Sequence, residues 1–116
     1  MSDNTTYKGQ FLNGKKHGIG EQVWPDGSCF MGSFKDGVSS GKGVQIFSTG
    51  DYYIGDWKNG MSDGFGEYYH EKDNILYEGE WLKGEQHGFG KEKYSDASFY
   101  EGKINHLLAF LISFNR

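Results

Sequence analysis

Hydrophobic and polar positions alternate in five short runs that recur along the chain. Each run holds an aromatic residue, a glycine two positions later, and a second large apolar residue two positions after that. The five runs are Tyr7–Phe11, Phe30–Phe34, Tyr53–Trp57, Tyr77–Trp81 and Tyr100–Ile104. They begin 23, 23, 24 and 23 residues apart, and the extra residue falls within 71–74. Because alternate residues of a strand share a face, each run predicts a β-strand with its large side chains on one face.

The opposite face of these strands has a different character. Its positions are mostly polar, and this face is predicted to meet solvent. These positions are Lys8, Gln10, Met31, Ser33, Ile54, Asp56, Glu78 and Glu80. On the first face, the glycine between two large side chains leaves a gap, which a ring from a neighbouring strand is predicted to fill.

A second strand is predicted in every full copy of the repeat. These strands cover residues 19–24, 44–47, 65–70 and 89–94. The segment that joins the two strands of a copy, such as 13–18, is predicted to be a tight loop whose glycines take positive φ. Pro25–Gly27 and Ser48–Gly50 are predicted to turn into the next copy. Each copy is therefore a hairpin, and since a lone hairpin is marginal in water, the hairpins are expected to stack into one sheet.

The organisation predicted for the whole chain is a single repeat array. All 19 glycines occupy recurring positions in it. A polar N-terminal tail, 1–6, precedes the array at 7–104, and a different segment, 105–116, follows it. The fold class is all-β, an elongated antiparallel sheet of about eight to ten strands, two per copy. At about 4.8 Å per strand, four copies predict a ribbon about 40 Å long.

The segment 105–116 breaks the pattern, because it holds no glycine and is far more hydrophobic than the array. It is too short to span a bilayer. We expect a cap for the last strand edge, with docking on a partner or insertion into lipid as alternatives. The candidate docking residues are Leu107, Leu108, Phe110, Leu111, Ile112 and Phe114. A helix capped by Asn105 is favoured, although the alternation also fits a strand.

Charge and cysteine content narrow the choice of partners. The net charge is −4, with +1 in residues 1–50 and −5 in residues 51–116. Nucleic-acid-binding proteins usually carry a basic footprint, so no nucleic-acid partner is expected. The longest basic cluster is Lys15-Lys16, whereas recognition of anionic lipid usually uses four to eight basic residues. A single cysteine, Cys29, excludes an intramolecular disulfide and fits a reducing compartment.

The sequence contains no complete motif for metal binding, phosphate binding or catalysis. His17 and His87 are three repeat periods apart, or about 30 Å in the predicted sheet, which is too far to share a metal. We interpret them as loop side chains that fix the hairpin turns. Gly18-x-Gly20 lacks the third glycine and the following helix of a phosphate-binding loop. No catalytic, cofactor-binding or metal-binding residue is therefore predicted, and the protein is not expected to be an enzyme.

Residues 7–104 resemble the MORN repeat (membrane occupation and recognition nexus). The family consensus is close to Tyr-x-Gly-x-Trp-x-x-Gly-x-x-His-Gly-x-Gly. Residues Tyr77–Gly90 match every consensus position, and Tyr7–Gly20 differ only in Phe11 for Trp. Copies two and three have Ser40 and Asp63 where the family has His. The resemblance implies an elongated antiparallel sheet of hairpins.

The resemblance also implies roles for the rings and for the protein. Structural repeat rings are expected at Tyr7, Phe11, Phe30, Phe34, Tyr53, Trp57, Tyr77, Trp81 and Tyr100. Proteins with this repeat have assembly rather than chemistry in common. Within the family, the chain resembles the small MORN proteins of axonemes and radial spokes. The expectation is therefore a cytoplasmic, non-enzymatic scaffold that binds other protein subunits in a cytoskeletal assembly, such as the axoneme of a cilium or flagellum. The alternative is a peripheral module that binds phosphoinositide membranes.

Overall fold

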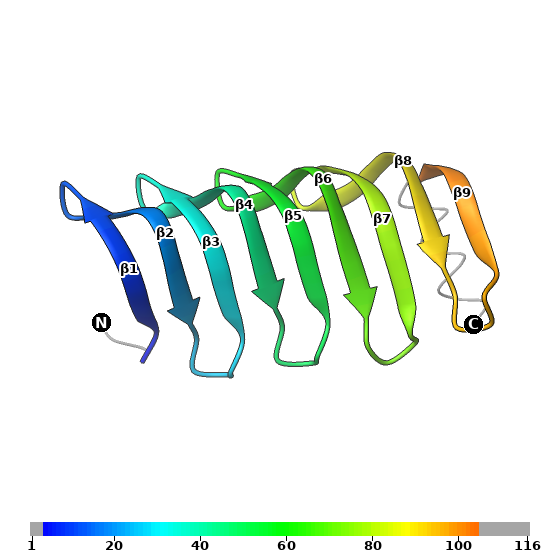
Figure 1. Cartoon of the computed structure of the whole chain (residues 1–116), viewed down its shortest axis with the longest axis horizontal. Helices are drawn as coiled ribbons and strands as arrows, with labels where there is room; N and C mark the ends of the chain where they lie inside the picture. Colours follow the sequence, from blue (N-terminus) through cyan, green and yellow to red (C-terminus); the bar gives the residue numbers. More distant parts are fainter. Residues whose placement is uncertain (1–3, 105–116) are drawn as a thin grey trace.

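The computed structural model describes residues 4–104 and shows one open sheet of nine antiparallel strands (Figure 1). The strands are β1 Thr6–Leu12, β2 Lys15–Val23, β3 Cys29–Lys35, β4 Val38–Ile46, β5 Tyr52–Lys58, β6 Met61–His70, β7 Ile75–Leu82, β8 Glu85–Lys93 and β9 Phe99–Ile104. Every strand pairs with the strands next to it in sequence. The described residues therefore confirm the predicted all-β sheet of stacked hairpins.

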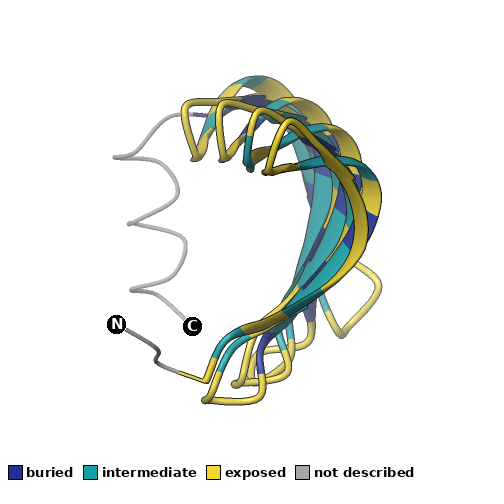
Figure 2. Cartoon of the chain, turned by 90° about the vertical axis from the view of Figure 1, so that its left-hand side faces the viewer, coloured by how far each residue is buried: buried dark blue, intermediate teal, exposed yellow. Residues whose placement is uncertain are grey.

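The sheet is longer than it is wide, and it is bent across its strands. The molecule extends over 47 × 25 × 22 Å, which is somewhat longer than the predicted ribbon because β9 adds a further strand. Figure 2 looks along the stack and shows the successive hairpins superimposed in one strongly curved outline. All hairpin turns consequently lie along one border of the sheet, and all turns between copies lie along the other.

The hairpin turns are shorter than predicted. In the first copy the turn is only Asn13-Gly14, with φ of 52° and 80°, which fits the two-residue type I′ turn. The strand β2 already begins at Lys15, so the prediction of a loop over 13–18 was wrong, and the second strands begin earlier than predicted. The reason is Gly18, whose φ of 72° lies inside the strand, next to a register shift between Gly9 and Phe11. This bulge lets the strand continue where a loop was expected.

Backbone hydrogen bonds attach each later hairpin turn to the copy before it. The N–H of Gly37 donates to the carbonyl of Lys16 at 3.0 Å. The same bond recurs from Gly60 to Ser39 and from Gly84 to Ser62. Each of these hairpin turns is therefore stabilised by the preceding copy as well as by the two strands that it joins.

The turns between copies form as predicted, by a different set of bonds. Trp24 donates to the carbonyl of Ser28 at 2.9 Å, and Gly27 donates back to the carbonyl of Trp24 at 3.0 Å. The Asp26 carboxylate accepts from the backbone N–H of Ser28 at 2.9 Å. In the last such turn Ala97 occupies the position of Gly27 with φ of 73°, a conformation that residues other than Gly, Asn and Asp rarely adopt.

Close packing of the rings explains the paired glycines at the centre of the sheet. A Cβ on Gly9 would lie 2.5 Å from the Cα of Gly20, and 2.7 Å from the Tyr7 hydroxyl oxygen. Equivalent glycine pairs face each other in the other copies. Tyr7 lies over both glycines of its pair, Gly9 on its own strand and Gly20 on the neighbouring strand. The gap at Gly9 is therefore filled by the ring of its own strand, whereas a neighbouring strand's ring was predicted there. The glycines let the rings lie directly on the backbone.

Candidate functional site

The large side chains of the repeat form a continuous ladder on one face of the sheet, which we call the ring face. The second ring of each later copy contacts two others, the first ring of its own copy and that of the preceding copy. Trp81 lies 5.4 Å from Tyr77 and 5.0 Å from Tyr53, between ring centroids. Contacts of the same edge-to-face kind continue through Trp57, Phe30, Phe34, Tyr7 and Phe11. Such pairs add about 0.5–1.5 kcal/mol each beyond area burial, so the ladder couples adjacent copies.

Burial along the ladder depends on whether a preceding copy is present. Tyr77 and Tyr53 are fully buried, and Trp81 is 8% exposed. Phe11, which has no preceding copy, is 62% exposed. Trp57 and Tyr100 are half-buried. The rings in the middle of the array therefore form its core, whereas Phe11 at the N-terminal end remains available to solvent.

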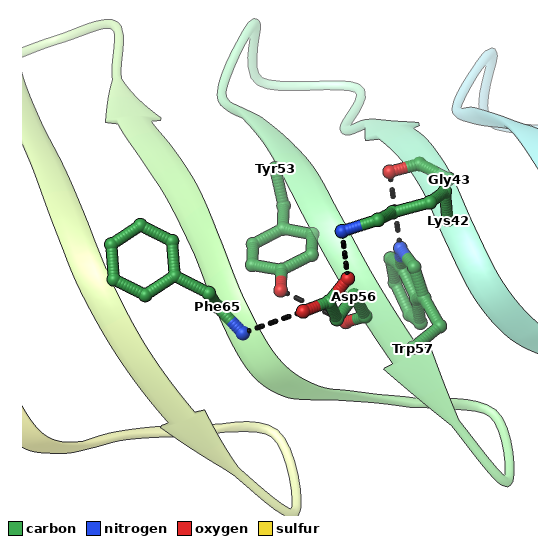
Figure 3. A network of polar contacts seen from close by, with 6 residues as sticks. All are labelled: Lys42, Gly43, Tyr53, Asp56, Trp57 and Phe65. Atoms are coloured by element: carbon green, nitrogen blue, oxygen red, sulfur yellow. Dashed lines mark hydrogen bonds and ion pairs between the residues drawn. The ribbon is translucent and has the colours of Figure 1, made fainter.

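The polar atoms of the rings donate hydrogen bonds to backbone carbonyls of the sheet (Figure 3). Tyr53 donates its hydroxyl hydrogen to the carbonyl of Asp56 at 2.9 Å, and the Trp57 indole N–H donates to the carbonyl of Gly43 at 3.2 Å. Tyr77 makes the same bond to the Glu80 carbonyl. Burial raises the pKa of Tyr77 to about 12, because the phenolate would lose its hydration there. These hydroxyls are neutral hydrogen-bond donors and do not supply acid–base chemistry near neutral pH.

Side chains at the bulges form a second recurring motif, which the sequence alone did not indicate. The Asp56 carboxylate accepts from the backbone N–H of Phe65 at 2.9 Å and pairs with the Lys42 ammonium (Figure 3). Gln10 and Glu80 accept in the same way from Ile19 and Phe89. Lys42 and the Phe65 N–H lower the pKa of Asp56. The signal that could have shown this motif is an acceptor side chain one position after the glycine of the opening run.

The face opposite the rings, which we call the back face, is less polar than predicted. Ile19, Phe65 and Phe89 project from the even-numbered strands and are 66%, 60% and 66% exposed. Met31 and Ile54 are also exposed on this face. The prediction considered back-face positions in the first strand of each copy only. It missed the residue that lies between the two glycines of the second strand. The back face therefore combines charged groups with unpartnered apolar side chains.

The C-terminal half of the back face is shaped around two of these phenylalanines. Phe65 and Phe89 border a shallow hollow whose wall includes Glu78, Lys91 and Glu101. The Lys91 ammonium also lies 4.3 Å from the ring centroid of Phe99, which is within cation–π range. Aromatic residues are enriched in protein interfaces, and the rim around them is polar.

Residues considered for metal or redox chemistry are dispersed. His17 is half-buried in β2, and His87 is exposed in β8, so both belong to strands and not to loops as predicted. Six strand spacings separate them, or about 29 Å. Within residues 4–104, His, Cys, Asp and Glu side chains form no group of three or more that could hold a metal ion. Cys29 is half-buried and not in a disulfide.

Two further observations concern membranes and the C-terminal segment. None of the residues 4–104 form a helix with the length and hydrophobicity that crossing a bilayer requires. The candidate docking residues Leu107, Leu108, Phe110, Leu111, Ile112 and Phe114 lie outside the described residues, as does the helix favoured for that segment. The cap and docking hypotheses for 105–116 therefore stay predictions.

Comparison with known families agrees with the geometry. A family model for the MORN repeat matches residues 7–29, 30–52, 53–74 and 77–99. A search of the curated proteins found no match. The four matched segments cover most of the chain and follow the hairpins seen in the sheet. The chain therefore belongs to the MORN-repeat family.

Proposed function

We propose that this protein is a non-enzymatic scaffold that binds other proteins through the back face of its sheet. The MORN repeat is a non-enzymatic module of protein or membrane interaction. The observation that carries the proposal is the pair Phe65 and Phe89, two large rings held in water beside charged groups. Burial of one such side chain against a partner would contribute about 1.5–3 kcal/mol.

The chemistry of the back face favours a protein partner over a lipid surface. Its hollow is lined by Glu78, Lys91 and Glu101, and Glu78 forms an ion pair with Lys93 at 3.1 Å, so acidic and basic groups alternate there. Such a mixed-charge surface lacks the cluster of basic residues that anionic lipid recognition uses, whereas it suits a protein with matching apolar and charged groups. A free strand edge offers a further attachment point, since β1 pairs with β2 alone among the described strands.

The setting that we propose is a cytoplasmic assembly of the cytoskeleton, such as the axoneme of a cilium or flagellum. This part of the proposal is supported by the family resemblance alone. A long, thin array is suited to such an assembly, because it offers much surface for its size. The partners would be other subunits of a multi-protein complex.

The test compares two phenylalanines of nearly equal exposure. The tagged full chain is used as bait from ciliated cells, and retained proteins are quantified by mass spectrometry. Phe89→Ala should remove a defined set of partners, and Phe11→Ala, a matched truncation on the ring face, should leave the set intact. Equal retention by both variants would contradict a back-face interface.

The membrane alternative is separated by co-sedimentation with vesicles that contain phosphatidylinositol phosphates. The scaffold proposal expects no binding by the isolated chain. Strong binding that falls as salt rises would favour the lipid-binding function instead.

A further inference from the structure

A buried carboxylate lies on the ring face of the last full copy. Glu92 is 4% exposed, and it lies across from Tyr77 on one side and from Tyr100 on the other. Its Oε1 accepts a hydrogen bond from the Tyr94 hydroxyl at 3.0 Å. Glu92 forms no ion pair with any Lys, Arg or His of residues 4–104. Carboxylates are rarely buried to this extent without a cationic partner.

A second buried acceptor on the same strand has no hydrogen-bond partner at all among the described residues. The Oε1 atom of Gln86 is buried and makes no hydrogen bond with the described residues. Gln86 lies across from Trp81, as Glu92 lies across from Tyr77. Burial of an acceptor without a hydrogen bond destabilises the fold, because the acceptor loses its hydration without compensation. In the fourth copy, Glu92 therefore lacks a cationic partner, and Gln86 Oε1 lacks a hydrogen-bond donor, among the described residues.

The first copy shows which group occupies the corresponding position. Lys16 and Gln22 stand at the repeat positions of Gln86 and Glu92, across from Phe11 and Tyr7. The Lys16 ammonium donates to Gln22 Oε1 at 2.8 Å and lies 5.5 Å from the centroid of the Tyr7 ring. The repeat itself thus places a cation between this acceptor and this ring.

We propose that Glu92, Gln86 and the ring of Tyr77 form a recognition site for a single lysine or arginine side chain of a basic protein partner. The incoming cation takes the place that Lys16 fills in copy one. It donates to the Glu92 carboxylate and to Gln86 Oε1. Copies two and three offer Ser39 with Gln45 and Ser62 with Tyr68 at these positions, so the charged site is specific to the fourth copy.

The charge distribution supports this occupant. Residues 51–116 carry a net charge of −5, against +1 in residues 1–50. A basic segment would therefore be steered toward the C-terminal half of the array. The proposal rests on the proposed scaffold function and names the chemistry of one of its partners.

The experiment uses a small cation and its neutral counterpart as probes. The full chain is titrated with N-acetyl-arginine amide and, separately, with N-acetyl-citrulline amide, which has nearly the same shape without the charge. Binding is followed through the indole N–H signal of Trp81 in NMR spectra. The arginine probe should shift that signal and saturate, and the citrulline probe should not. Equal shifts with both probes would overturn the proposal.

Two protein variants separate this site from general charge. Glu92→Gln restores the residue found at this position in copies one and two, and it should weaken binding of the arginine probe at least about tenfold. Glu71→Gln makes the same charge change in the exposed turn between β6 and β7 and should leave binding unchanged. Equal binding by Glu92→Gln and the unaltered chain would refute the site.

A third variant tests the site through an increase in stability and not through a loss of binding alone. Gln86→Lys supplies the cation from the chain itself, at the position of Lys16. It should raise the midpoint of thermal unfolding and should abolish binding of the arginine probe. A lower midpoint, or unchanged probe binding, would contradict the site. None of these measurements involves Phe89. The cation site can therefore be refuted while the back-face interface is supported, and the back-face interface can be refuted while the cation site is supported.

Discussion

Removal of one ring from the ladder should cost stability in proportion to its burial, and Trp81 is the most informative position. Its indole is 8% exposed and contacts rings of two copies. Trp→Ala at a buried site costs about 3–5 kcal/mol. The lost hydrogen bond to the Gly66 carbonyl leaves a backbone acceptor unpaired, which favours the upper part of that range. We therefore expect Trp81→Ala to lower the free energy of unfolding by about 4–5 kcal/mol.

Phe11 provides the control at the end of the same ladder. It makes an edge-to-face contact with Tyr7 at 5.0 Å, but it is 62% exposed and has no preceding copy. Scaling the cost of a buried Phe→Ala change by the buried fraction gives about 1–2 kcal/mol. Trp57, which is half-buried, should give an intermediate loss.

Urea unfolding followed by far-ultraviolet circular dichroism measures all three variants. The order of loss should be Trp81→Ala, then Trp57→Ala, then Phe11→Ala. If Trp81→Ala and Phe11→Ala agree within about 0.5 kcal/mol, burial does not set the cost and the reasoning is refuted. If Trp81→Ala leaves stability unchanged but removes partner binding, the ladder is a binding surface and not a core.

Three further predictions concern turns and charge, each measured by urea unfolding. Ala97→Gly should stabilise the fold by about 0.5–1 kcal/mol, because its φ is positive, whereas Gly27→Ala at the equivalent turn should destabilise it. Lys83→Asn should add about 0.5 kcal/mol, since Lys83 holds a φ of 49° that asparagine tolerates better. The lowered pKa of Asp56 means that its contribution is present above about pH 4 and is lost as pH falls through that pKa, so Asp56→Asn should flatten the acid limb of the stability curve. An unchanged acid limb, or no gain from either turn substitution, would contradict the corresponding argument.

The sequence predicted the fold because its strongest signals are local and repeated. An aromatic residue two positions before a glycine indicates a strand, and Asn13-Gly14 indicates a tight turn. The extent of each hairpin could not be predicted, because a glycine with positive φ marks a loop or a bulge equally well, and Gly18 is the latter. Only the register of the assembled sheet separates these two cases.

The candidate surfaces were harder to predict than the fold. No face was predicted for Phe65 and Phe89, each of which lies between two glycines. Their exposure depends on the direction in which each bulged strand faces. The unbonded acceptor of Gln86 and the carboxylate of Glu92 without a cation become apparent only when copies are compared at equal register. The role of residues 105–116 has no repeat to compare with and remains a prediction.

The two borders of the sheet tolerate changes in chain length to different degrees. The hairpin-turn border is closed by bonds such as that from Gly37 to Lys16 of the preceding copy, so an inserted residue there would disturb two copies at once. The opposite border already carries an extra residue within 71–74, and the strands on either side, β6 and β7, keep their regular pairing. Evolutionary insertions, and engineered ones such as an epitope or a fluorescent group, should therefore be accommodated between copies, where a loop can lengthen while the faces of the sheet keep their register.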